Sequence, residues 1–129
     1  MSASSRPAGL HYKITGLKEF NNFAANLGSD ISQAFQQTIT KYGNIMNNQM
    51  LQRVPVKTGF LRSTIGKDMT QSQLKLYATA FYAGYVNYGT LWMPPRPFFT
   101  GPIDENVPKL IDELNKMIGT GIKSRLKGG

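Results

Sequence analysis

The longest regular pattern in the chain is a helical one in its N-terminal half. From Leu17 to Met50, apolar side chains recur at steps of three and four residues, which is the spacing of an amphipathic helix. Pro55 disfavours helical backbone at Val54, the residue before it. The pattern therefore predicts a long helix that ends by about Arg53.

A glycine interrupts this predicted helix near its middle. Gly28 is followed by Ser29 and Asp30, an order that suits the end of one helix and the start of another, because Gly favours helix C-termini and Ser or Asp favour N-termini. The apolar positions nevertheless continue in phase on both sides of Gly28. The pattern favours one helix over residues 17–53, with a weak point at Gly28 that costs about 1 kcal/mol.

The polar side of this helix is unusual because amides take the place of the charged residues that a solvated helix commonly carries. Burying an amide against another subunit costs less desolvation free energy than burying an ion. This side is therefore a candidate subunit interface, with an ordinary hydrophilic surface as an equally weighted alternative. The amides are Asn21, Asn22, Asn26, Gln33, Gln36, Gln37, Asn44, Asn47, Asn48, Gln49 and Gln52.

Two shorter stretches predict an antiparallel hairpin. Residues 60–68 and 74–82 flank the polar sequence MTQSQ, which has the length of a hairpin connection. Side chains alternate between two faces in a strand, so the second stretch should turn one face towards the long helix: Leu74, Leu76, Ala78, Ala80 and Tyr82. The other face carries Tyr77 and Phe81, which a partner or the C-terminal helix could cover. A further short strand is expected over Leu10–Thr15.

The C-terminal third consists of a proline-rich loop and a second amphipathic helix. Three prolines between residues 92 and 97 exclude regular structure there. Beyond them, apolar residues recur with helical spacing as far as Leu126. Pro102 suits the first turn of this helix, whereas Pro108 either kinks the helix or delays its start to near Asn106. Residues 124–129 are expected to fray, and residues 1–9 to form a flexible arm.

Together these elements predict an α+β fold. A small antiparallel sheet packs against a long helix in the N-terminal half and against a C-terminal amphipathic helix. A chain of 129 residues has the usual length of one domain, so residues 1–129 are expected to form a single domain.

Two motifs stand on either side of the predicted hairpin. The first is VPVKTGFLRSTI, residues 54–65, and the second is FYAGYVNYGTLWMPPRPFF, residues 81–99. Their order and spacing resemble the gene-product-ten-like tail-component family of long-tailed bacteriophages. Two positions depart from the family pattern, since Lys57 and Asn87 stand where acidic residues are common, which puts in doubt any ion pair at those sites.

The first motif reads mainly as a folding device. Pro55 ends the helix, Thr58 can cap the turn that follows, and Gly59 gives that turn its backbone freedom. Leu61 is expected to point inward. Arg62 has five donors, and it is expected either to brace the C-terminus of the long helix or to contact another subunit.

The second motif supplies most of the candidate interface residues. Tyr85 and Tyr88 have the large amphipathic side chains that are enriched at interfaces. Trp92 and Arg96 lie on the proline-stiffened loop and belong to the residue types that dominate binding hot spots. Phe99 completes the predicted subunit or partner interface. The structural part of this motif comprises Gly89, Pro97 and Phe98, the last as an anchor of the loop on the core.

The resemblance implies a virion structural protein that completes the tail and joins it to the head. Such a protein would assemble in the host cytoplasm as a homo-oligomeric ring, with a hexamer as the family-level expectation. Its expected partners are the tail tube or tail terminator protein on one side and the head connector or head completion protein on the other. A heterologous ring needs two different patches on each subunit, and the amide-rich helix side and the loop of residues 92–99 are the candidates.

Composition bears on three other classes of function: enzymes, membrane proteins and nucleic-acid-binding proteins. The chain has no cysteine, one histidine, seven scattered carboxylates and no phosphate-binding glycine motif, so no catalytic, metal or cofactor site is predicted and the chain is not expected to be an enzyme. No stretch reaches the ~20 apolar residues of a membrane span. The net charge of +8 is spread along the chain. It favours non-specific contact with packaged DNA, and the alternative function is a small basic nucleic-acid-binding module.

Overall fold

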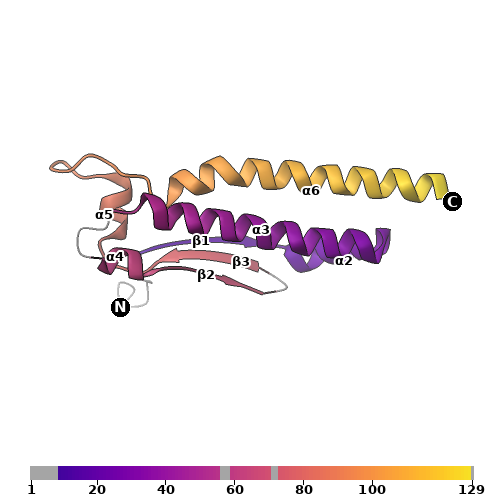
Figure 1. Ribbon diagram of the computed structural model, residues 1–129, viewed down its shortest axis with the longest axis horizontal. Helices are drawn as coiled ribbons and strands as arrows, with labels where there is room; N and C mark the ends of the chain where they lie inside the picture. The colour runs from indigo at the N-terminus through magenta and orange to yellow at the C-terminus, as the bar shows by residue number, and fades with distance from the viewer. Residues whose placement is uncertain (1–8, 56–58, 71–72, 129) are drawn as a thin grey trace, which may run out of the picture.

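A three-stranded sheet and two long helices form most of the molecule (Figure 1). The computed structural model describes residues 9–55, 59–70 and 73–128, with side chains as far as Lys123. The fold is α+β, as the sequence predicts. In chain order the elements are β1 (Leu10–Thr15), α2 (Leu17–Leu27), α3 (Ser29–Arg53), α4 (Phe60–Ser63), β2 (Ile65–Met69), β3 (Gln73–Ala78), α5 (Ala83–Tyr88) and α6 (Thr100–Gly128).

The sheet is antiparallel, with β3 between β1 and β2. Tyr12 of β1 and Lys67 of β2 both lie opposite Leu76 of the central strand. Leu74, Leu76 and Ala78 are fully buried, whereas the residues between them are only half-buried. This alternation confirms the prediction that the Leu74 face packs against the long helix, because side chains at every second position share one face.

The core lies between this face and α3. Phe35, Ile39, Met46 and Met50 point from α3 into the core and are almost fully buried, and each such side chain contributes roughly 1.5–3 kcal/mol. Helix and strand approach closely at Gly43, where an added Cβ would lie 3.2 Å from a methyl carbon of Leu74. The small residue therefore sets the spacing between helix and sheet.

The prediction of one helix over residues 17–53 is wrong, because the chain folds back at Gly28. This residue has φ 149° and ψ 149°, a conformation that side-chain-bearing residues rarely adopt. The rings of Phe20 and Phe35 stack with centroids 5.2 Å apart, and the hydroxyl of Ser32 donates to Asn21 Oδ1 at 2.9 Å. Folding back lets α2 and α3 bury their apolar sides against each other, and an unbroken apolar phase does not distinguish this hairpin from one straight helix.

The predicted strands are also too long. Residues 60–63 form the short helix α4, and β2 begins only at Ile65. The Thr64 hydroxyl donates to the Leu61 carbonyl at 2.8 Å and accepts from the Ala80 N–H at 3.1 Å, so side-chain hydrogen bonds stabilise a turn where the pattern predicts strand. The strand β3 ends at Ala78, and Phe81 stands in the following turn with 76% of its surface exposed.

The C-terminal helix lies along α3 (Figure 1). It begins at Thr100, so Pro102 is in the first turn as predicted. Pro108 lies inside the helix and does not delay its start. The backbone is helical as far as Gly128, and the expected fraying of residues 124–129 stays a prediction, as does the single domain. Because α6 packs on α3, it does not cover the outer face of the sheet. Of the two coverings predicted for that face, the C-terminal helix is therefore wrong, and a partner stays a prediction.

Candidate interaction surface

The two sequence motifs meet at one end of the molecule, beyond the C-terminus of α3. There α4, α5 and the proline-rich loop surround an apolar cavity of about 440 Å³. The first motif contributes one wall and the second motif the others, and among the described residues that line the cavity only Arg96 is charged. The lining residues are Pro55, Leu61, Tyr82, Val86, Met93, Pro94 and Arg96. This cavity is called the motif pocket below.

The described residues of the first motif lie between the end of α3 and the start of α4. Helix α3 ends at Arg53, immediately before the sequence Val54-Pro55. Gly59 precedes α4 with φ 78°, and Leu61 is buried in the core. Thr58, the predicted cap, lies outside the described residues, as does Lys57.

Arg62 contacts the last turns of α3. Its Nε donates to the Leu51 carbonyl at 3.3 Å, and such bonds satisfy carbonyls that have no partner within a helix end. This contact agrees with the predicted brace of the helix C-terminus. The other predicted role, contact with another subunit, stays a prediction.

Asn87 joins the second motif to the start of α6. Its side chain is 1% exposed, and its Oδ1 accepts hydrogen bonds from the backbone N–H groups of Phe99 and Thr100, both at 3.1 Å. Its Nδ2 donates to the Thr100 hydroxyl at 3.1 Å. A neutral amide thus satisfies the helix start, and no ion pair is needed at this position. The sequence reading missed this role, although a lone Asn among apolar and aromatic residues could have indicated it.

The loop after α5 is held rigidly from several sides. The backbone N–H groups of Thr90 and Met93 donate to each other's carbonyls at 2.8 and 3.3 Å, and the N–H of Arg96 donates to the Val86 carbonyl at 2.9 Å. Gly89 has φ 81°, and a Cβ there would lie 2.7 Å from the backbone nitrogen of Pro95. Only glycine fits this close approach without displacing the loop.

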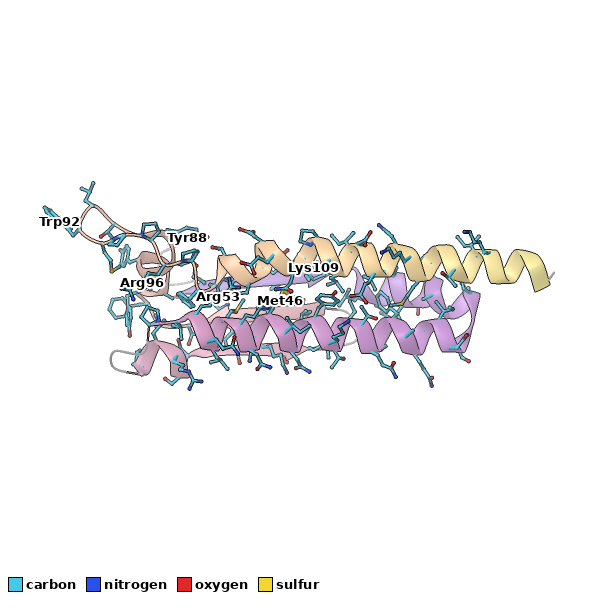
Figure 2. The ribbon with its side chains drawn as sticks, turned by 45° about the horizontal axis from the view of Figure 1, so that its top comes forward. Met46, Arg53, Tyr88, Trp92, Arg96 and Lys109 are labelled. Atoms are coloured by element: carbon cyan, nitrogen blue, oxygen red, sulfur yellow. The ribbon has the colours of Figure 1, made fainter. Side chains whose placement is uncertain are left out.

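Large side chains project from this rigid loop and from α5. Trp92 is 92% exposed and the adjacent Leu91 is 96% exposed, while Tyr85 and Tyr88 are 61% and 65% exposed. Figure 2 shows Trp92 at the far tip of the loop, pointing away from the helices, and Tyr88 and Arg96 nearer its base. Since exposed apolar surface of this extent often marks an interaction site, this group of residues is a strong candidate. Together with Phe81, it is called the aromatic end below.

The two phenylalanines that follow Pro97 lie in the core. Phe98 is 1% exposed, as its predicted anchoring role requires, and Phe99 is 3% exposed. Their rings pack edge to face with centroids 6.3 Å apart. The structure thus places Phe99 inside the protein rather than on the predicted interface, because its N–H bond to Asn87 fixes it at the buried start of α6. It is not part of the aromatic end.

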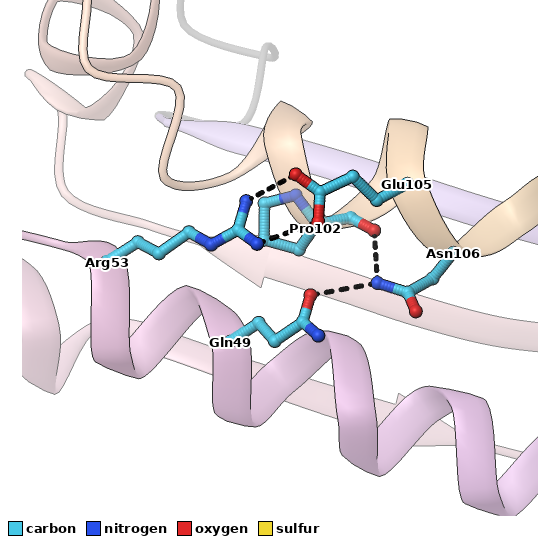
Figure 3. Close-up of polar contacts among 5 residues, drawn as sticks. All are labelled: Gln49, Arg53, Pro102, Glu105 and Asn106. Atoms are coloured by element: carbon cyan, nitrogen blue, oxygen red, sulfur yellow. Dashed lines mark hydrogen bonds and ion pairs between the residues drawn. The ribbon is translucent and has the colours of Figure 1, made fainter.

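A polar network joins α3 to α6 near the same end of the molecule (Figure 3). Arg53 donates to both carboxylate oxygens of Glu105, with N–O distances of 2.9 and 2.7 Å. The Nδ2 of Asn106 donates to Gln49 Oε1 at 2.9 Å and to the Pro102 carbonyl at 2.7 Å. These pairs hold the two helices in register, and sequence reasoning did not identify them because the partners are more than fifty residues apart.

A second polar contact lies farther along the same helix pair. The hydroxyl of Tyr42 donates to the carboxylate of Glu113, and Lys41 Nζ lies 3.5 Å from that carboxylate. The hydrogen bond from Tyr42 holds the pKa of Glu113 below its ordinary value, and the charge of Lys41 acts in the same direction. The same bond raises the pKa of Tyr42.

Two groups can be distinguished among the eleven amides of the N-terminal helices. Asn21 and Gln49 bond to side chains of this chain, so they are used inside the fold. Others are exposed on α3 and recur at steps of four or seven residues, which places them along one side of the helix. This exposed set is called the amide stripe: Gln33, Gln37, Asn44, Asn48 and Gln52.

In the part of the chain that the structure describes, His11 and the carboxylates form no group of three or more that could hold a metal ion. None of the described helices has both the length and the apolar character that crossing a membrane requires.

Comparison with protein families identifies the class of protein to which the chain belongs. Residues 18–89 match the model of a family described as "Bacteriophage HK97-gp10, putative tail-component". The match covers more than half of the chain, and the chain therefore belongs to this family of phage tail components. No curated protein and no solved structure matches the chain. Membership in the family supports a structural role in the virion tail.

Proposed function

We propose that this protein completes the phage tail and joins it to the head as a homo-oligomeric ring, with six copies as the expected number. Membership in a tail-component family supports the general role. The observation that carries the finer proposal is the aromatic end, where Leu91 and Trp92 are almost fully exposed on a loop that is fixed by backbone hydrogen bonds. A rigid aromatic surface loses little conformational entropy on docking.

The work of such a protein is association and not chemistry. A joining ring needs contacts between its own subunits, a contact with the tail tube or tail terminator protein, and a contact with the head connector or head completion protein. Arg62, Tyr85, Tyr88, Trp92 and Arg96 are the side chains of the two motifs proposed for these contacts, and the amide stripe is a further candidate surface. Assembly is proposed to take place in the host cytoplasm before the virion is complete.

The outer face of the sheet supports a second contact, with packaged DNA. The helices α3 and α6 lie on one side of the sheet (Figure 1). On the other side, Lys13 of β1 stands opposite Lys75 of β3, which in turn stands opposite Asp68 of β2. The two lysines would attract phosphates without reading sequence. Binding to duplex DNA that weakens steeply as salt rises supports this contact, whereas tight binding at physiological salt would favour the alternative of a dedicated nucleic-acid-binding module.

Electron microscopy of particles made without this protein tests the joining role. We expect separate DNA-filled heads and separate tails, because the link between them is missing. Intact virions in the absence of the protein would contradict the proposal. Supplying the protein in trans should restore joined particles.

Complementation with variants tests whether the aromatic end matters for joining. Trp92→Ala combined with Arg96→Ala should fail to restore infectivity, since both side chains are removed from an otherwise unchanged loop. Phe23→Ala is the matched control, because Phe23 is a partly exposed aromatic residue on α2. Equal infectivity of the double variant and the control would argue against a joining role for this end.

A further inference from the structure

We infer that the Trp92 side chain of one copy of this protein inserts into the motif pocket of a second copy. The inference rests on the proposed ring and adds the residues of the contact between its subunits. It also changes the assignment of surfaces, because the pocket, and not the amide stripe, is the patch that receives the loop. The amide stripe then stays available to a different neighbour.

The inserting group is an exposed and preorganised turn. Leu91 and Trp92 are 96% and 92% exposed, although burial of such side chains is favourable. Thr90 and Met93 pair across the turn, and the Thr90 hydroxyl accepts from the Trp92 N–H at 3.1 Å. The turn therefore holds the backbone of Trp92 in a defined conformation with the indole exposed, so inserting it into a partner requires no ordering of the loop backbone.

The receiving site suits an aromatic side chain. The motif pocket has a volume of about 440 Å³, within the ~300–1,000 Å³ typical of ligand pockets. Its lining is mainly apolar, and Trp92 is not among the lining residues. Arg96 supplies one guanidinium, which attracts the face of an aromatic ring and favours Trp most. The pocket and the indole are thus complementary in both polarity and charge.

The chain itself contains both halves of this contact, which is the reason to assign the guest to a second copy. Met93, Pro94 and Arg96 line the pocket, while Trp92 on the same loop lies outside it. A contact between two different patches of identical subunits generates rings when the rotation closes. Residues 1–8, which the structure does not describe, have the sequence MSASSRPA and contain no aromatic side chain that could take the place of Trp92.

The test uses Trp92 as its own reporter, since it is the only tryptophan in the chain. The intact protein is examined over a concentration series, with the oligomeric state followed by light scattering and the indole by fluorescence. On association, the emission of Trp92 should move to shorter wavelength and become protected from acrylamide quenching. Association with an unchanged emission would overturn the inference.

Three variants separate insertion from general association. Trp92→Ala should weaken self-association about 30-fold or more, as for a central hot-spot residue, and Phe23→Ala should leave it unchanged. Val86→Phe adds bulk to the pocket wall and should leave Trp92 exposed at all concentrations, whereas Ile111→Phe, on the exposed side of α6, should not. If Val86→Phe does not fold, Arg96→Ala serves instead, with a loss of about 2- to 30-fold.

The outcomes also separate this inference from the proposed function. A blue-shifted complex with the mass of a closed ring supports both, and a blue-shifted dimer supports the insertion while contradicting the ring. A protein that stays monomeric alone, and whose Trp92 emission shifts only when another virion protein is added, overturns the insertion and leaves the joining role standing. Intact virions in particles that lack the protein would contradict the joining role without bearing on the insertion.

Discussion

The helix pair α3–α6 and the aromatic end use their polar and aromatic side chains in opposite ways. Between the helices, Arg53 is paired with Glu105, and Gln49 with Asn106. At the aromatic end, backbone hydrogen bonds join Thr90 to Met93 and Arg96 to Val86, but Leu91 and Trp92 contact little of their own chain. Polar side chains of the helix pair therefore stabilise the fold, whereas the large side chains of the aromatic end project into solvent.

This difference indicates which region faces a partner. A side chain that bonds within the chain already gains its stabilisation in the monomer, so another protein can add little to it. An exposed indole on a fixed loop contributes favourable burial free energy only when a second surface covers it. The comparison favours the aromatic end as the site of assembly and the helix pair as its support.

The largest expected effect concerns Asn87, which connects the two regions. Asn87→Ala should lower the free energy of unfolding by about 4 kcal/mol, because the buried N–H of Phe99 and the partly buried N–H of Thr100 lose their acceptor, at about 1–3 kcal/mol each. Urea unfolding measures the change. The exposed Asn48→Ala provides the control and should shift stability by less than about 0.5 kcal/mol. A small loss for Asn87→Ala would mean that α6 does not depend on this contact.

Gly89 tests how firmly the loop is fixed. Gly89→Ala should destabilise the protein by about 3 kcal/mol, since Gly89 has backbone (φ 81°, ψ 172°) that essentially only glycine adopts, at a cost of about 1–3 kcal/mol for another residue, and overpacking typically adds about 1–3 kcal/mol. Gly59→Ala serves as the control, because Gly59 also has a positive φ, in the left-handed region (φ 78°, ψ -13°), but has open space around its Cβ position, and it should cost about 1 kcal/mol. Thermal unfolding compares the two. Equal losses would show that the loop yields easily, and the comparison of the two regions would then fail.

The helix pair should respond to acid, while the aromatic end should not. The pKa of Glu105 is lowered by its hydrogen bonds to Arg53, and the pKa of Glu113 by its bond to Tyr42. A carboxylate with a lowered pKa stabilises the fold at pH values above about 4.3, the ordinary pKa of a Glu side chain. This contribution is lost as the pH falls through the lowered pKa. Denaturant midpoints from pH 7 to pH 3 should therefore depend less on pH in a Glu105→Gln, Glu113→Gln variant. An unchanged pH profile would show that these pairs do not stabilise the fold.

The smallest expected effect separates the two groups of amides. Gln49→Ala removes the acceptor of Asn106 and should cost about 1 kcal/mol. Gln37→Ala, on the exposed amide stripe, should stay within about 0.5 kcal/mol. Both values come from urea unfolding of the monomer at low concentration. A large loss for Gln37→Ala would show that the amide stripe supports the fold of the single chain.

Much of the fold follows from local pattern. The alternation in β3, the end of α3 before Pro55 and the first-turn position of Pro102 agree with the sequence reading, since each depends on neighbours in the chain. The break at Gly28 and the short helix α4 do not follow from it. Both depend on contacts between segments that are distant in the chain, and the spacing of apolar residues carries no information on such contacts.

The interface role of the candidate residues stays a prediction, and their exposure follows from the sequence only in part. Trp92, Arg96 and the two tyrosines are on the surface where the sequence motifs place them, because prolines and glycines define the loop directly. Phe99, a predicted interface residue, lies in the core, and Asn87, to which the sequence analysis assigned no role, connects the loop to α6. An aromatic residue next to a loop is equally suited to an interface or a core, and only the folded chain shows that Phe99 is buried and that Asn87 binds the start of α6.

By itself, the sequence determined the fold class, the family and the stiff loop that carries Trp92. These properties depend on residue order and on local conformational preference, and both can be read from the sequence without tertiary contacts. Only the tertiary structure decided that α2 folds back on α3, that Asn21 and Gln49 form hydrogen bonds within the chain, and that the two motifs enclose a pocket. Each of these depends on the approach of residues distant in the chain, and that approach is set by how the whole core packs.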